Sequence, residues 1–330
     1  MSTVRANIEE TRLHPVHEIL TITLNPALDM NTEAEKVVPD VKLRCTEPKV
    51  DPGGGGINVA RAIRHMGGHA TAVVAIAGHN GNRLLELLMD QGIPTMPIPS
   101  PGETRASVVV NCKETGQQYR FMLPGPPWQE DHVQKAIRTT AAHAPKDGLV
   151  ILSGSQPPGV PLDFEEHLSA AIMEAGARLI VDTSGPALRQ IVEDHRSPPF
   201  LLRSDDEEAE GLAGRKLETP ADTAAFSREL IEKGVAENII FARGGEGSVL
   251  TTKEGSWLAT APKVQVISKV GAGDSYVGAF TLALARGNTI QEAARWGASA
   301  AAAAVATPAT ELCRGEDVER LLPQSKLIEL

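Results

Sequence analysis

The chain has 330 residues, of which 42% are hydrophobic, which is enough to bury the core of one large domain. Its formal net charge of −10 argues against partners such as nucleic acid or an anionic membrane surface. The cysteines (Cys45, Cys112 and Cys313) have no paired spacing, which favours a reducing compartment and a cytoplasmic location.

The first 18 residues contain Glu9, Glu10 and Glu18 and lack an apolar core. They do not resemble a signal peptide, and we expect a flexible tail there. No later apolar run approaches 18 residues without a charged or polar break, so we expect no membrane span.

From residue 19 onward, short apolar runs alternate with stretches of helical periodicity. The runs predict strands over 19–24, 71–75, 149–153, 179–182, 200–203 and 238–242. The periodic stretches predict helices that include 57–66, 81–91, 163–175, 220–233 and 274–286. Such alternation is typical of a mostly parallel sheet with helices on both faces, which binds ligands beyond the carboxyl ends of its strands.

Two segments, at about 30–50 and 105–123, break this alternation and read as β-strands outside the main sheet. The apolar residues Val108, Val110 and Phe121 then cluster outside the core, on a face available for contact. The alanine-rich run 297–307 predicts a close-packed, buried helix.

Four consecutive glycines, Gly53 to Gly56, precede the helical run that contains Asn58. Four glycines cost backbone entropy, so this position needs a positive φ or a close approach to the backbone. A polar ligand held against the chain, with Asn58 reaching it from the first helical turns, would meet that need. A tight strand-to-helix turn is the alternative, although it usually needs only one or two glycines.

A second glycine-containing motif, Gly271-Ala272-Gly273-Asp274, runs directly into an apolar helix. It places an acid on the first helical turn, where backbone N–H groups have no partner and attract anions. A carboxylate there can take a proton from a hydroxyl while the N–H groups stabilise a transferring phosphoryl group. The alternative is that the glycine and the aspartate only cap the helix.

Other site types are excluded. The chain has no G-x-x-x-x-G-K-[ST] motif, and Tyr276 stands at the third glycine position of a dinucleotide fingerprint. Two glycines between His65 and His69 break the helix that a metal-binding pair would need. Ser155 does not lie in a G-x-S-x-G nucleophile elbow.

With both glycine motifs, the chain resembles the ribokinase-like sugar kinases of the PfkB family from about residue 19 to about 315. Further matching motifs are TLNPALD (23–29), KLRC (42–45), Thr104-Arg105, SGSQPPG (153–159), VDTSG (181–185) and RGGEG (243–247). Relatives that act on fructose 1-phosphate or tagatose 6-phosphate typically carry a lysine in the glycine run. The four glycines and KLRC are similar to the fructose-6-phosphate version.

The resemblance implies one ribokinase-like kinase domain over 19–330, with three α/β/α layers and a small β-sheet lid formed by the two unusual segments. It implies ATP-dependent phosphorylation of fructose 6-phosphate to fructose 1,6-bisphosphate with Mg²⁺, and a homodimer formed through the lid. Two alternatives stay open. One is a kinase for another hexose phosphate, such as fructose 1-phosphate or tagatose 6-phosphate. The other is a weakly active or inactive regulatory relative that binds sugar phosphates or nucleotides.

By the same resemblance, Asp274 is the base, and Gly271, Ala272 and Gly273 form the anion hole. Residues expected to bind the sugar phosphate are Asp29, Lys42, Arg44, Gly54, Gly55, Asn58, Arg105 and Ser155. Residues expected near the nucleotide are Arg203, Asp205, Ala242, Gly244, Gly247, Ser268 and Val270, with Glu208 assigned to the metal. Outside the family context, Lys42 or Arg105 alone would be read as a solvated surface charge.

The chain also departs from the family pattern. Asp205 replaces an asparagine that can donate to phosphate oxygens, whereas an ionised aspartate would repel them. A solvated acidic turn is the other reading of Asp205. Residues 307–311 replace a motif associated with a monovalent cation, so activation by K⁺ is open. Ala242 stands where serine or threonine is common beside the nucleotide.

Overall fold

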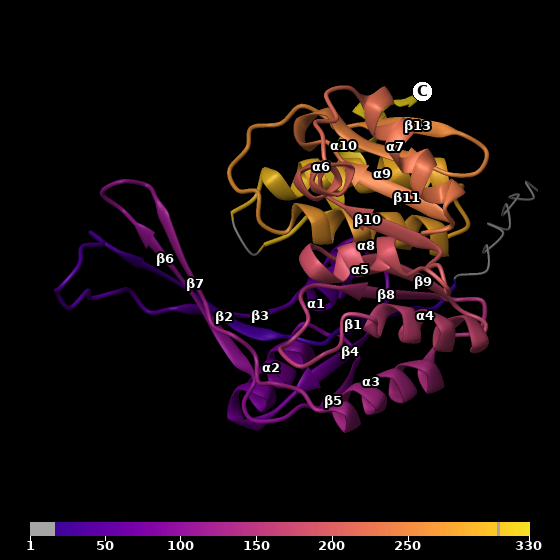
Figure 1. The fold of residues 1–330 in the computed structure, drawn as a ribbon. Coiled ribbons are helices and arrows are strands. Elements are labelled where there is room, and N and C mark those ends of the chain that lie inside the picture. Colours follow the sequence, from indigo (N-terminus) through magenta and orange to yellow (C-terminus); the bar gives the residue numbers. More distant parts are fainter. Residues whose placement is uncertain (1–16, 309–310) are drawn as a thin grey trace, which may run out of the picture.

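The main sheet has ten strands in the computed structural model, which describes residues 17–308 and 311–330 (Figure 1). Its spatial order is β14 (Leu327–Glu329), β13 (Ser256–Thr260), β12 (Gly247–Thr251), β11 (Asn238–Ala242), β10 (Leu201–Ser204), β9 (Arg178–Asp182), β8 (Leu149–Ser153), β1 (Ile19–Thr23), β4 (Thr71–Ile76) and β5 (Thr95–Pro99). The strands from β11 to β5 run parallel, and β12 to β14 add antiparallel strands at one edge.

Two hydrophobic cores lie on the two faces of this sheet, because successive strand residues point to opposite sides. In β1, for example, Leu20 and Ile22 belong to one core and Ile19 belongs to the other. The first core is covered by α3 (Glu130–His143), α4 (Phe164–Glu174), α5 (Gly185–Glu193), α6 (Asp206–Ala213) and α7 (Pro220–Glu232). The second is covered by α1 (Gly55–His65), α2 (Gly78–Asp90), α8 (Ala272–Ala285) and α9 (Ile290–Val305), while α10 (Gly315–Leu321) packs beside α9. This arrangement is the predicted α/β/α sandwich.

Small residues let α8 pack closely against α9 and α1. A Cβ on Gly297 would lie 2.8 Å from the ring of Tyr276 in α8, and one on Gly278 would lie 3.0 Å from Ala62 in α1. Most of the alanines of α9 are buried. The alanine-rich run is therefore a close-packed helix, as predicted, and it supports α8 from behind.

A second sheet forms the lid, with the order β3 (Lys49–Gly53), β2 (Ala27–Ala34), β6 (Arg105–Cys112) and β7 (Gln118–Met122). Figure 1 shows it extending to one side of the main body. None of Val108, Val110 and Phe121 joins a core cluster, as expected, but Val110 is only 8% exposed whereas Phe121 is 53% exposed. The lid thus buries part of its own apolar surface and leaves the remainder open.

All six predicted strands and five predicted helices form, with ends that shift by a few residues. Residues 1–16 of the expected tail lie outside the described residues, while the His17 N–H donates to the Ala285 carbonyl at 3.0 Å. In the described part of the chain, no helix is long and apolar enough to cross a membrane.

Candidate active site

Asp274 is the third residue of α8, and Gly271 begins that helix in the left-handed conformation, with φ 77°. A Cβ at Gly271 would lie 2.6 Å from the Leu312 side chain, so this position excludes larger residues. The helix has no side-chain N-cap, which leaves its first N–H groups without a partner inside the helix. The predicted pairing of a carboxylate with open backbone donors is therefore present.

A pocket of about 220 Å³ lies in front of Asp274, at the carboxyl ends of β8, β9 and β10. Four of the predicted site residues line it together: Ser155, Arg203, Asp205 and Asp274. The remaining wall consists of the Asp182 carboxylate and of hydroxyl and backbone groups from Ser153, Gly154, Thr183, Ser184 and Ser204. Such a lining suits a polar ligand.

Asp274 accepts a hydrogen bond from Nδ2 of Asn58 at 2.9 Å, although the two residues are 216 positions apart. Burial and the nearby charge of Asp182 raise the pKa of Asp274 from 3.8 to about 7, against the lowering effects of Asn58, Arg203 and Arg61. A carboxyl group with such a pKa is suited to accept a proton near neutral pH. Asp274 thus has the position and the chemistry of a general base.

Arg203, expected beside the nucleotide, is held by Asp182. Its Nη1 donates to Asp182 Oδ1 at 2.9 Å, and its guanidinium lies 5.7 Å from the ring centroid of Tyr276. A Cβ on Gly273 would lie 2.9 Å from Arg203 Nη1, so the positive charge sits directly against the glycine turn. This placement adds a cation to the backbone donors of the predicted anion hole.

The four-glycine run is explained mainly by contacts within the protein. A Cβ on Gly55 would lie 2.4 Å from Ser153 Oγ, and one on Gly56 would lie 2.3 Å from the Ile22 carbonyl. Gly54 has φ 127°, and a Cβ on Gly53 would overlap Asp29. The predicted close approach is therefore real, but it brings the chain against β1, β8 and the Asp29 carboxylate. Ligand contact is not needed to explain it.

Asp29 lies on β2, opposite Asp51 of β3 and Ser107 of β6. Burial raises its pKa, while a hydrogen bond from Ser107 and the charges of Arg105 and Arg120 lower it. The carboxylate is therefore surrounded by charged and hydroxyl groups at the base of the lid.

Arg105 is tied to Asn25, in the turn between β1 and β2. Its Nε donates to Asn25 Oδ1 at 3.1 Å, and its Nη2 donates to the Asn25 carbonyl at 3.1 Å. Asn25 Nδ2 in turn donates to Ser155 Oγ at 3.2 Å. The predicted sugar-phosphate residues Arg105 and Ser155 thus meet through Asn25.

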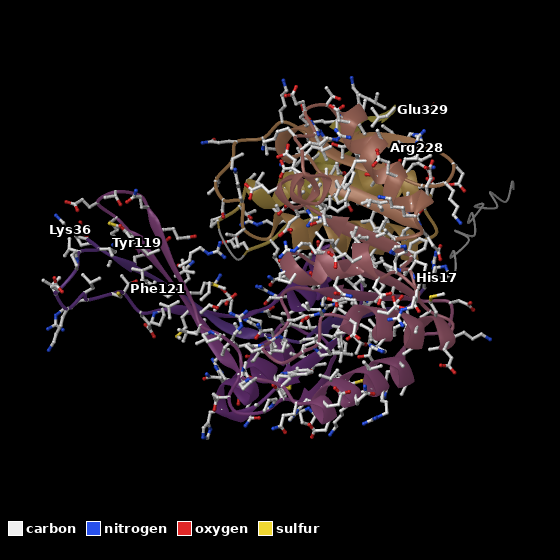
Figure 2. All side chains as sticks on the ribbon, viewed as in Figure 1. His17, Lys36, Tyr119, Phe121, Arg228 and Glu329 are labelled. Atoms are coloured by element: carbon white, nitrogen blue, oxygen red, sulfur yellow. The ribbon has the colours of Figure 1, made fainter. Side chains whose placement is uncertain are left out.

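Lys42 and Arg44 are not brought to this site. They lie in the exposed loop between β2 and β3, where Cys45 pairs with Ala34 at the end of β2. Ala34 lies five positions after Asp29 along the strand, a span of about 16 Å that exceeds the reach of an arginine side chain. Lys36, from the same loop, lies at the far end of the lid in Figure 2. Within one chain, both residues are remote from the pocket.

The other residues expected near the nucleotide follow β11 or precede α8. Ala242 ends β11, and Gly244 begins a short 3₁₀ turn (Gly244–Glu246). A Cβ on Gly244 would meet nothing within 4 Å, whereas one on Gly247 would lie 2.0 Å from the Ala259 carbonyl. Ser268 Oγ accepts from the Val270 N–H at 3.2 Å and shapes the loop before α8. Gly244 thus borders open space, whereas Gly247 is required by the sheet.

Asp205 and Glu208 both cap helices. Asp205 Oδ1 accepts from the Glu208 N–H at 2.9 Å and starts α6, and Glu208 Oε1 accepts from the Gly185 N–H at 2.9 Å at the start of α5. Asp205 is exposed and also lines the pocket. One oxygen of each carboxylate is therefore engaged by a backbone N–H. No group of three or more His, Cys, Asp or Glu residues in the described chain is arranged to hold a metal ion by itself.

Several residues that contribute to the site were not assigned a role from the sequence: Asn25, Arg61, Ser107, Arg120 and Asp182. Asn25 and Asp182 lie inside motifs that carried the family resemblance, and Arg61 lies in the helical run that follows the four glycines. Their contacts join elements far apart in the chain, and no local spacing signals them.

Comparison with known proteins gives consistent results. Residues 22–316 match the pfkB family of carbohydrate kinases. ATP-dependent 6-phosphofructokinase isozyme 2 of Mycobacterium tuberculosis (strain ATCC 25618 / H37Rv) is 39% identical over 302 residues, which are 92% of this chain and 88% of the relative. The protein of the same name from Escherichia coli (strain K12) is 36% identical over 303 residues, which are 92% of this chain and 97% of the relative. A 1-phosphofructokinase of Bacillus subtilis (strain 168) is 29% identical over 312 residues, covering 94% of this chain and all of the relative.

Solved structures agree. Phosphofructokinase-2 from Escherichia coli in complex with potassium superimposes with a TM-score of 0.87 at 35% identity, covering 93% of this chain and 99% of that one. Its complex with fructose-6-phosphate gives a TM-score of 0.85 at the same identity and coverage. The chain belongs to the pfkB family of carbohydrate kinases.

Proposed function

We propose that this protein transfers the γ-phosphoryl group of ATP to fructose 6-phosphate and produces fructose 1,6-bisphosphate. The observation that carries the proposal is Asp274 at the open N-terminus of α8, bonded to Asn58 and facing a polar pocket. The relatives described above at 36% and 39% identity are named ATP-dependent 6-phosphofructokinases, which supports the choice of substrate.

In this reaction, the free hydroxyl of the sugar lies at Asp274. The carboxylate accepts the hydroxyl proton while the hydroxyl oxygen bonds to the γ-phosphorus and the bond to ADP breaks. The N–H groups at Gly271–Gly273 and the nearby Arg203 guanidinium stabilise the negative charge of the transferring group. Each role is assigned to a group whose position is described above.

Mg²⁺ enters as part of MgATP, the donor substrate. Glu208 is the carboxylate that fits this ion, because one of its oxygens is engaged by a backbone N–H and the second oxygen is available for a cation or its water. Ala242, Gly244, Ser268 and Val270 border the space that ATP would occupy, while Gly247 shapes the adjacent strand.

Arg105, Asn25 and Ser155 form the part of the site that holds the 6-phosphate, and Asp29 holds sugar hydroxyls. Lys42 and Arg44 lie too far away within the same chain, so they serve the site only if a second copy contributes its lid. A homodimer formed through the lid would bring them there. Exposed apolar side chains on the lid, such as Phe121, fit this contact.

An ADP-release assay over a panel of acceptors tests the function. We expect fructose 6-phosphate to be the best substrate, and fructose 1-phosphate, tagatose 6-phosphate and free fructose to be poorer. Parallel reactions with and without K⁺ settle cation activation. Faster turnover of fructose 1-phosphate, ribose or free fructose would contradict the substrate assignment.

The presence of Asp205 in place of asparagine favours one other candidate, a regulatory relative that binds these ligands without efficient transfer. Calorimetry with fructose 6-phosphate and a non-hydrolysable ATP analogue distinguishes the two. Tight binding of both ligands without ADP release would support the regulatory function.

A further inference from the structure

Arg61 is a buried cation close to the proposed base, although it does not line the pocket in front of Asp274. It belongs to α1, three residues after Asn58, and is 6% exposed. Buried arginines are costly unless their donors are satisfied, and these donors reach three elements. Its Nε donates to Gln91 Oε1 at 2.9 Å, and its Nη2 lies 3.8 Å from Asp51 Oδ1.

The contact that matters for chemistry is with Asn58. Arg61 Nη1 donates to Asn58 Oδ1 at 3.3 Å, and Asn58 Nδ2 donates to Asp274 Oδ2 at 2.9 Å. An amide side chain has an accepting end and a donating end. If the Asn58 amide rotated by half a turn, its NH₂ would face the guanidinium and its carbonyl oxygen would face the carboxylate, so both contacts would become repulsive.

We propose that Arg61 is a positioning residue for the phosphoryl transfer: it fixes the orientation of the Asn58 amide, which in turn holds the Asp274 carboxylate toward the sugar hydroxyl. This inference rests on the proposed role of Asp274 as base. It adds Arg61 to the residues that support the base, because Asn58 connects this buried cation to Asp274.

The charges around Asp274 agree with this role. Asp182 from β9 faces it and raises its pKa, as burial does, while Arg203 from β10 and Arg61 from α1 lower it. Burial lowers the pKa of Arg61, and the charges of Asp51, Asp29 and Asp274 oppose that effect. Arg61 is therefore a cation that Asp274, Asp51 of β3 and Asp29 share.

The test compares Arg61→Gln with Arg61→Lys and with the matched control Arg64→Gln, an exposed arginine on the same helix. In Arg61→Gln we expect kcat/KM at neutral pH to fall on the order of 10–100-fold, and the acid limb of the pH–rate profile to move up by about one pH unit. Arg61→Lys keeps the charge and restores the acid limb, but it loses the fork that holds Asn58 and restores the rate only in part. Arg64→Gln leaves both unchanged.

The removal of Arg61 also leaves Asp51 buried without this partner, which by itself can destabilise the fold. The double variant Arg61→Gln/Asp51→Asn removes both charges. If Arg61 supports the base, the shifted acid limb persists in the folded double variant, because it follows the loss of the Arg61 charge near Asp274. The part of the rate that Arg61→Lys does not restore reports the lost contact to Asn58. An acid limb at the wild-type position in a folded Arg61→Gln or double variant overturns the inference, because a merely structural residue changes the amount of active protein without moving the profile.

Asp274→Asn, measured in the same series, separates this inference from the proposed function. If Asp274→Asn is inactive and Arg61→Gln keeps the wild-type profile, only the role of Arg61 fails. If Asp274→Asn turns over normally, the assignment of the base fails, and the role of Arg61 fails with it.

Discussion

Replacement of Asp274 by asparagine is expected to remove activity and to stabilise the protein. The side chain keeps its size and can still accept from Asn58, but it cannot take a proton, so kcat should fall on the order of 10²–10⁴-fold. In the folded protein, burial and Asp182 disfavour the charged carboxylate and raise its pKa from 3.8 to about 7. At about 1.4 kcal/mol for each pH unit, this rise sets a ceiling of about 4 kcal/mol on the stability that the charge costs.

The sign follows from proton binding. Because the folded state holds this proton more tightly than the unfolded state, wild-type stability falls relative to that of the neutral variant as pH rises from about 4 to about 7. Above pH 7 the difference is constant. The net pKa of about 7 already includes the attraction to Arg203 and Arg61. Because about 4 kcal/mol is a ceiling, we expect the variant to be more stable by roughly 1–3 kcal/mol at pH 8, and by less at pH 5.

Urea unfolding of both proteins at pH 5 and pH 8 measures this difference, with Asp90→Asn, which removes an exposed carboxylate at the end of α2, as the control. Equal stability of the Asp274→Asn variant and the wild type at both pH values would refute the claim that Asp274 carries an electrostatic cost. Near-normal turnover in the folded variant would end its assignment as base.

Four further substitutions test other parts of the site. Arg105→Ala should raise KM for fructose 6-phosphate by about tenfold or more, because a charge-assisted contact to the sugar phosphate is lost, and should change KM for ATP little. Equal effects on both KM values would contradict the assignment of Arg105 to the sugar phosphate. Asp205→Asn keeps the acceptor that caps α6, so the stability of the protein should not change. We expect kcat/KM for MgATP to rise by the equivalent of about 1–2 kcal/mol, and a lower Mg²⁺ concentration to give half the maximal rate. An unchanged Mg²⁺ response would show that Asp205 does not face the phosphates. Gly245→Ala, next to Gly244 in the turn that borders the proposed ATP site, adds a Cβ with nothing within 4 Å, so thermal unfolding should be unchanged and KM for ATP should rise. Gly55→Ala should instead destabilise the fold by about 1–3 kcal/mol, because its Cβ would lie 2.4 Å from Ser153 Oγ. A normal KM for ATP in Gly245→Ala would place the nucleotide elsewhere.

Most of the parallel part of the fold was readable from the sequence, although β5 was not among the predicted strands. Strands such as β8 and β11 are buried on both faces and therefore appear as continuous apolar runs, so their predicted bounds match the observed ones. The antiparallel edge was missed, because β14 is three exposed residues whose pairing with β13 depends on tertiary contact. Helix α5 has only nine residues and a proline near its start, which gives too short a periodic pattern to recognise.

At the site, the sequence predicted the residues whose type is unusual for their position, such as Asp274 after a glycine turn. It did not predict residues whose role comes only from their partners. Arg61 reads as an ordinary charged residue in a helix, and only the fold shows that it is buried between Asn58 and Asp51. The glycine run was correctly read as a place of close approach, but the approaching groups are β1, β8 and Asp29.

The way in which the lid is joined to the body sets limits on engineering. Only residues 24–26 separate β1 from β2, and only Gly54 separates β3 from α1. A chimaera could exchange the lid between relatives at the visible edges of its sheet, with a cut directly after Gly53. That cut would separate Asp29 and Gly53, which lie against each other, from Asn58. The smallest exchangeable unit on this side therefore runs from Asn25 to Arg61, so that the new lid arrives with its own support for the base.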